Sequence, residues 1–121
     1  MIYKEECYKI IGICMEIHRE LGKGFKEVVY KDAMEIEFRK VGILFEREKK
    51  YTIDYKGEIL PHKYIADFVA YDKIILEVKA IIKVPEEFVA QTLNYLAVSK
   101  CRLGMIINFG TTSLEYKRIV L

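Results

Sequence analysis

The sequence has too few cysteine, glycine and proline residues for several classes of protein. Among its 121 residues are three cysteines, seven glycines and two prolines. The scarcity of glycine and proline excludes collagen, and an odd number of cysteines without C-x-x-C spacing argues against a disulfide framework or a zinc site. We therefore expect Cys7, Cys14 and Cys101 to be buried, reduced thiols, since unpaired cysteine packs as a small apolar residue.

Strong net charge and long apolar runs are also missing. Twenty lysines and arginines against 18 acidic residues leave a net charge of +2, too weak for a general polyanion binder. The longest uncharged stretch, Leu103 to Leu114, is shorter than the roughly 20 residues that cross a bilayer. The apolar stretch Ile10 to Met15 is too short for a secretory signal. We expect a cytoplasmic protein with no membrane partner.

The residues that are present indicate a globular protein that begins with two helices. Hydrophobic residues make up 52% and charged residues 31%, and the length suits a single domain over residues 1–121. Apolar residues recur every three or four positions from Cys7 to Leu21, and again over about residues 25 to 40. Gly22 and Gly42 follow these segments as helix-terminating signals.

The pattern then changes to that of strands. Residues 45–55 and 59–70 indicate two strands joined by a turn at Lys56-Gly57, and 73–82 is a continuous apolar run typical of a central strand. A helix is predicted from Pro85 to about Ser99, then strands over 101–108 and 115–121. The order α-α-β-β-β-α-β-β predicts an α/β sandwich, with a central mixed β-sheet flanked by helices.

Three charged residues interrupt the most apolar strands. Glu77 and Lys79 lie in the 73–82 run and share one face, because side chains at i and i+2 point the same way. Asp67 lies in the preceding strand, and a hairpin centred near residue 72 would place it opposite Glu77. Burying unpaired charge is costly, so this arrangement calls for a reason. The structural alternative is a Glu77–Lys79 ion pair, with Asp67 as a turn residue.

The functional interpretation is a metal site. Two carboxylates are typical ligands of Mg²⁺, and a neighbouring lysine can orient an attacking water or offset charge on a phosphoryl transition state. Crowding of like charges predicts that, without metal, one of the two carboxylates has a raised pKa.

Further motifs give the sequence a family resemblance. Asp67, Glu77 and Lys79, with Ala66 at the variable first position, match the PD-(D/E)XK signature. Over nearly the whole chain the sequence resembles the GxxExxY family of the PD-(D/E)XK nuclease superfamily. The other segments that carry the resemblance are His18-Arg19-Glu20-Leu21-Gly22, Gly24-Phe25-Lys26-Glu27-Val28-Val29-Tyr30, Gln91-Thr92-Leu93-Asn94-Tyr95 and Ile106-Ile107-Asn108-Phe109-Gly110.

The resemblance implies a restriction-endonuclease-like fold and a set of residue roles. Mg²⁺, or Mn²⁺ in its place, would be the cofactor. The implied catalytic residues are Asp67, Glu77, Lys79, Glu27 and Gln91. The implied metal ligands are Asp67, Glu77, Glu27 and the carbonyl of Val78. The implied substrate-binding residues are Tyr95, Tyr30 and His18.

Some of these roles have structural alternatives. His18 falls on the apolar stripe of the first helix, which favours a hydrogen-bonded core histidine over a substrate contact. Tyr30 is one helical turn from Glu27 and either packs in the core or holds that carboxylate with its hydroxyl.

We expect a metal-dependent nuclease that hydrolyses phosphodiester bonds of nucleic acid, most simply DNA, and that forms a homodimer. One alternative is a weak or inactive nucleic-acid-binding or assembly module that retains the fold. The other is a plain structural domain in which the Glu77–Lys79 pair fixes strand register.

Overall fold

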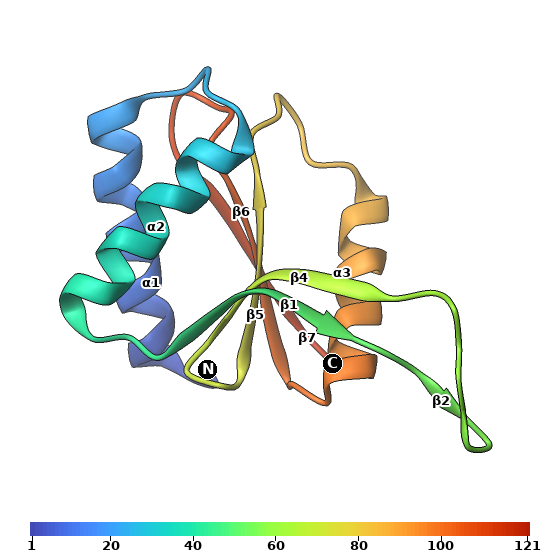
Figure 1. Cartoon of the computed structure of the whole chain (residues 1–121). Helices are drawn as coiled ribbons and strands as arrows, with labels where there is room; N and C mark the ends of the chain where they lie inside the picture. The colour runs from blue at the N-terminus through green and yellow to red at the C-terminus, as the bar shows by residue number, and fades with distance from the viewer.

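The computed structural model describes residues 1–121 and contains three helices and seven strands (Figure 1). Both amino-terminal helices follow the predicted apolar stripes and end at Gly22 and Gly42. The elements in chain order are α1 (Lys4–Leu21), α2 (Glu27–Val41), β1 (Phe45–Tyr51), β2 (Asp54–Tyr55), β3 (Glu58–Ile59), β4 (Tyr64–Ala70), β5 (Ile74–Lys79), α3 (Glu86–Ser99), β6 (Leu103–Asn108) and β7 (Glu115–Val120).

Five of the strands form one mixed sheet in the order β1-β4-β5-β6-β7. Only β5 and β6 are parallel, because α3 connects them, and the other neighbours are antiparallel. Figure 1 shows α1 and α2 on one face of the sheet and α3 on the other. The predicted α/β sandwich, with the apolar strand at its centre, is confirmed.

Two of the predicted strands are wrong in extent. The 45–55 and 59–70 segments each divide, and their inner ends form a separate, exposed two-stranded hairpin of β2 and β3. Pro61, which cannot donate to a ladder, lies between β3 and β4. Lys56 and Gly57 both have positive φ, as a tight hairpin turn requires.

The sheet separates two apolar clusters. Alternate residues of β5, Ile74, Leu76 and Val78, pack with α1 and α2, whereas Ile75 packs with Tyr95 and Leu96 of α3. By the same alternation Glu77 and Lys79 point toward the α3 face.

The three cysteines are free, and Cys7 and Cys14 are fully buried. Cys101 is only half-buried, which corrects the expectation that all three lie in the core. None of the helices combines the length and the apolar composition needed to cross a bilayer.

Candidate active site

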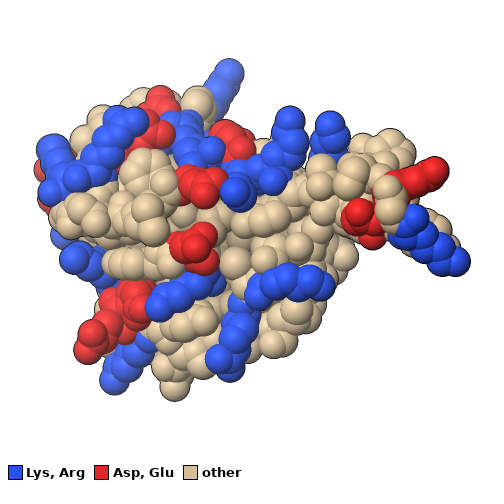
Figure 2. All heavy atoms as spheres, turned by 60° about the horizontal axis from the view of Figure 1, so that its bottom comes forward, with Lys and Arg blue, Asp and Glu red and all other residues tan.

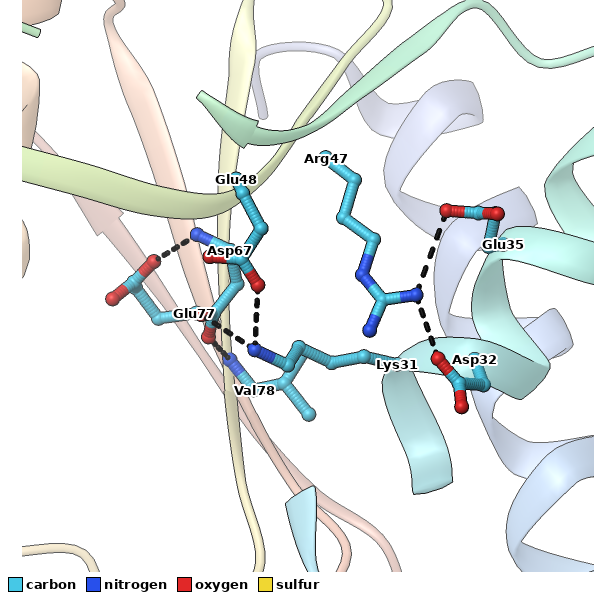
Figure 3. A network of polar contacts seen from close by, with 8 residues as sticks. All are labelled: Lys31, Asp32, Glu35, Arg47, Glu48, Asp67, Glu77 and Val78. Carbon is cyan, nitrogen blue, oxygen red and sulfur yellow. Dashed lines mark hydrogen bonds and ion pairs between the residues drawn. The ribbon is translucent and has the colours of Figure 1, made fainter. Parts of the chain in front are cut away.

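The site forms where β4 and β5 diverge. Their ladder contains Phe68↔Leu76, Val69↔Ile75 and Ala70↔Ile74, which confirms the predicted register. One step further, two hydrogen bonds from backbone N–H groups to carboxylates replace the ladder (Figure 3). The N–H of Asp67 donates to Glu77 Oε2 at 2.9 Å, and the N–H of Val78 donates to Asp67 Oδ2 at 2.7 Å. Each acid therefore fills the gap by binding the backbone of the opposite strand.

Burial makes Glu77 an unusual acid. The residue is 5% exposed, and burial first, then the negative charge of Asp67, raises the pKa of its carboxyl from 4.5 to about 8. The hydrogen bond from the Asp67 N–H and the positive charges of Lys79 and Lys31 act in the opposite direction. The predicted raised pKa is confirmed, but burial contributes more than crowding. At neutral pH this carboxyl retains its proton unless a cation compensates its charge.

Lys79 lies beside the acids without forming an ion pair. Its ammonium is 4.2 Å from the centroid of the Phe88 ring in α3, a cation–π contact that keeps the group on the Glu77 face. The structural alternative required a Glu77–Lys79 ion pair and placed Asp67 in a turn. The structure forms no such pair and places Asp67 within β4.

The segment after β6 fixes the chain that follows Lys79. Asn108 is 1% exposed, and its side chain accepts from the N–H of Ile81 at 3.0 Å and donates to the carbonyl of Ile81 at 2.9 Å. The N–H of Phe109 donates to the carbonyl of Lys79 at 2.8 Å. A Cβ at Gly110 would overlap the backbone of Ile81, so only glycine fits there. This clamp ends β5 at Lys79 and corrects its predicted extension to residue 82.

Tyr30 and His18 support this segment from the α1–α2 side. Tyr30 is fully buried, stacks on Phe109 with ring centroids 4.4 Å apart, and donates from its hydroxyl to the Gly22 carbonyl at 2.6 Å. His18 is 9% exposed, stacks on Phe109, and has Nε2 2.9 Å from the Thr111 carbonyl. Direct substrate contact is therefore wrong for Tyr30, whose ring has no exposed surface. The hydroxyl of Tyr30 binds backbone and does not hold Glu27, and His18 lies in the core.

The other candidate residues make no hydrogen bond or ion pair with the two acids. Glu27 is the first residue of α2 and makes no side-chain hydrogen bond or ion pair. Gln91 is exposed on α3. Tyr95, four residues on, is buried against Tyr64 with ring centroids 5.5 Å apart. Burial, then the charges of Glu77 and Asp67, raises the pKa of Tyr95 to about 12, which places this phenol near both acids.

Sequence reasoning missed Lys31 and Glu48. The Lys31 ammonium is 3.3 Å from Asp67 Oδ1 and 2.9 Å from Glu48 Oε1, so it bridges β4 and β1 from α2 (Figure 3). Neither hydrophobic periodicity nor a sequence motif identifies Lys31 or Glu48. The one sequence signal for Lys31 is its position one helical turn after Glu27.

The donor set fits a divalent cation of the magnesium type. No group of three His, Cys, Asp or Glu side chains is arranged to hold a metal, so Glu27 does not form a ligand cluster with Asp67 and Glu77. Mg²⁺ commonly uses one or two carboxylates and completes its shell with water and substrate oxygens. Asp67 and Glu77 supply those two carboxylates, and the high pKa of Glu77 marks a group that a cation would help to ionise.

The chain resembles a solved structure and matches one family model. The protein titled "Crystal structure of SSO0001" superposes with a TM-score of 0.63 at 15% identity, covering 78% of this chain. This chain spans half the length of that protein, and the likeness shows the fold. No curated protein sequence matches the chain. The model of the PD-(D/E)XK nuclease superfamily matches residues 4–119. With its restriction-endonuclease-like sheet and helices, the chain belongs to the PD-(D/E)XK nuclease superfamily.

Proposed function

We propose that this protein is a metal-dependent nuclease of the GxxExxY group that hydrolyses phosphodiester bonds of DNA. The observation that carries the proposal is that Asp67 and Glu77 each bind the backbone of the opposite strand where β4 and β5 diverge, with Lys79 on the same face as Glu77. Nuclease chemistry is what superfamily membership suggests, and DNA as the substrate extends it.

Each site residue then has a physical role. Asp67 and Glu77, with the Val78 carbonyl, would hold Mg²⁺ or Mn²⁺. Glu27, which forms no ligand cluster with them, would act only through water from the start of α2. The cation supplies positive charge for the phosphodiester and lowers the pKa of water. Lys79 orients the attacking water or offsets charge as it develops on the phosphoryl group. Its contact with Phe88 fixes the ammonium in advance, so little reorganisation is needed.

The charges of the site support a cation. Glu27, Asp67, Glu77 and Lys79 sum to −2 when all are ionised, which repels a phosphodiester. Lys31 and Glu48 add one charge of each sign and leave that sum unchanged. Without metal at neutral pH Glu77 is protonated and the sum is −1, whereas one divalent cation with all four groups ionised brings it to zero, which favours phosphate binding with metal bound.

The helix α3 offers the substrate-facing residues. We assign Gln91, exposed on this helix, to contact phosphate or support Lys79, and Tyr95 to the inner wall beside the acids. Lysines and arginines are scattered among acidic groups over the face in Figure 2, which provides no continuous basic groove there. We therefore propose a homodimer, which would lengthen the surface available to DNA.

A second candidate is a nucleic-acid-binding or assembly module without useful turnover. The ion pair between Lys31 and Asp67 favours it, because an internal ammonium already compensates one of the acids. Under this reading the acids serve the fold and the bound nucleic acid is not cleaved.

Cleavage of a substrate panel separates the two candidates. Single- and double-stranded DNA and RNA are incubated with the protein and Mn²⁺, or with EDTA. We expect Mn²⁺-dependent cleavage that is lost in Asp67→Ala and Lys79→Ala, while circular dichroism shows both variants folded. Lys73→Ala is the matched control, because Lys73 pairs with Glu6. Binding of DNA by wild type without cleavage of any substrate would favour the binding module.

A further inference from the structure

Lys31 occupies the one oxygen of Asp67 that no backbone group uses. Asp67 Oδ2 accepts the Val78 N–H at 2.7 Å, whereas Oδ1 has only the Lys31 ammonium, at 3.3 Å. We infer that Lys31 is an internal cation that competes with metal for Asp67, and that Glu48 is the carboxylate that draws this ammonium away when metal binds. The inference rests on the proposed metal site and names two positioning residues for it.

The burial of the pair makes the competition energetically significant. The side chains of Lys31 and Asp67 are 13% and 17% exposed. Charges so shielded from water interact more strongly than a surface pair does. A divalent cation approaching Asp67 therefore meets a fixed positive charge, and its binding improves if that charge can move.

Glu48 is placed to receive the ammonium. In the ladder of β1 and β4, Arg47↔Phe68 and Lys49↔Ala66 flank it, so Glu48 lies directly opposite Asp67. Its carboxylate is 2.9 Å from Lys31 Nζ and its side chain is 50% exposed. Lys31 can therefore stay paired with Glu48 after it has left Asp67.

The backbone is strained at this position. Glu48 has a φ of 55° inside a strand, a left-handed conformation that costs free energy for any residue other than glycine. Such outliers persist where the surrounding structure imposes them, and they concentrate at functional sites. The strain falls on the residue that faces Asp67, which agrees with a specific role for the Glu48 carboxylate.

The helix that carries Lys31 is anchored independently. Arg47 of β1 pairs with Asp32 at 2.7 Å and with Glu35 at 3.5 Å, both on α2 (Figure 3). These pairs hold α2 against β1 whether or not Lys31 contacts Asp67. Rotation of one side chain is then enough to move the ammonium. Once released, the ammonium stays with Glu48 on the α2 side, while Lys79 lies on the α3 side.

Manganese affinity in the absence of nucleic acid tests the inference. Mn²⁺ binding to the purified full chain is measured by calorimetry and by the electron paramagnetic resonance signal of free Mn²⁺. We expect Lys31→Met to bind Mn²⁺ about tenfold more tightly than wild type, because a shielded positive charge is removed. Glu48→Gln should bind it several-fold more weakly, because Lys31 then has Asp67 alone as a partner.

Charge-matched controls accompany these variants. Lys73→Met removes a lysine paired with Glu6, and Glu46→Gln neutralises an exposed acid of β1, so neither should change Mn²⁺ affinity. The double variant Lys31→Met/Glu48→Gln should behave as Lys31→Met, since Glu48 acts through Lys31. Lys31→Met and Glu48→Gln should change Mn²⁺ affinity in opposite directions. A purely structural ion pair would affect the stability of both variants, and it would not produce opposite changes in Mn²⁺ affinity.

The outcomes separate the inference from the proposed function. Unchanged or weaker Mn²⁺ binding by Lys31→Met, with normal binding by wild type, overturns the inference alone. If Lys31→Met does not fold, unchanged or tighter binding by Glu48→Gln overturns it. Absence of Mn²⁺ binding in folded wild type, or binding that survives in Asp67→Asn unchanged, overturns the proposed metal site together with the inference.

Discussion

Replacing Glu77 with glutamine should stabilise the metal-free protein at alkaline pH and leave it nearly unchanged at acidic pH. The pKa of this carboxyl is about 8 in the folded chain, against 4.5 without its surroundings. When a group binds its proton more tightly in the folded chain, the folded protein loses stability as the pH rises from the unfolded-state pKa to the folded-state pKa. Each pH unit costs about 1.4 kcal/mol, so ionised Glu77 destabilises the fold by as much as about 5 kcal/mol at pH 9.

Glutamine retains the carbonyl oxygen that accepts the Asp67 N–H but carries no charge. We therefore expect Glu77→Gln to raise the free energy of unfolding at pH 9 by roughly 3–5 kcal/mol, and to change it by less than about 1 kcal/mol at pH 5. The neighbouring phenol of Tyr95 stays neutral in this range, since its pKa is raised to about 12.

Urea unfolding followed by circular dichroism at pH 5, 7 and 9, with EDTA present, measures the effect. Glu46→Gln, at an exposed position of β1, serves as the control and should follow the wild-type profile. Parallel pH profiles for wild type and Glu77→Gln would show instead that Glu77 ionises as easily in the folded chain as in the unfolded one.

Three further results are expected from the same structure. Gly110→Ala should lower the free energy of unfolding by more than about 2 kcal/mol, because its Cβ overlaps the backbone of Ile81, whereas Gly12→Ala, with open space around it, should raise it by about 0.5–1 kcal/mol; equal effects in urea titrations would contradict the clamp. Tyr30→Phe should cost about 1–2 kcal/mol, because the Gly22 carbonyl loses its donor, and an unchanged urea midpoint would contradict this. Mn²⁺ should raise the melting temperature more at pH 8 than at pH 5, because protons compete for Glu77; the opposite order in thermal scans would argue against this carboxylate as a ligand.

Much of the fold is readable in the sequence because its signals are local. Apolar spacing and the terminating Gly22 and Gly42 specify the first two helices, and the continuous apolar run marks β5 as the central strand. The register of the β4–β5 hairpin follows from the position of its turn. The extents of the strands are less accessible, because the clamp of Asn108 on Ile81 depends on a residue 27 positions away.

The site is only partly predictable for the same reason. Asp67 and Glu77 stand out because charges are rare in apolar strands, and their convergence follows from register. The contact of Lys31 with Asp67 and Glu48 depends on how α2, β4 and β1 pack together. A charged residue in the sequence does not by itself indicate which residue it will pair with. Tyr30 illustrates the opposite error, because a residue within a functional motif packs in the core.

The gap between β4 and β5 should seat a divalent cation. A crystal of the protein soaked in Mn²⁺, examined by anomalous scattering at the manganese edge, tests it most directly. We predict one strong anomalous peak bonded to carboxylate oxygens of both Asp67 and Glu77, absent in crystals of Asp67→Asn. A manganese peak elsewhere on the molecule, with none between these two acids, would show that this gap is not the metal site.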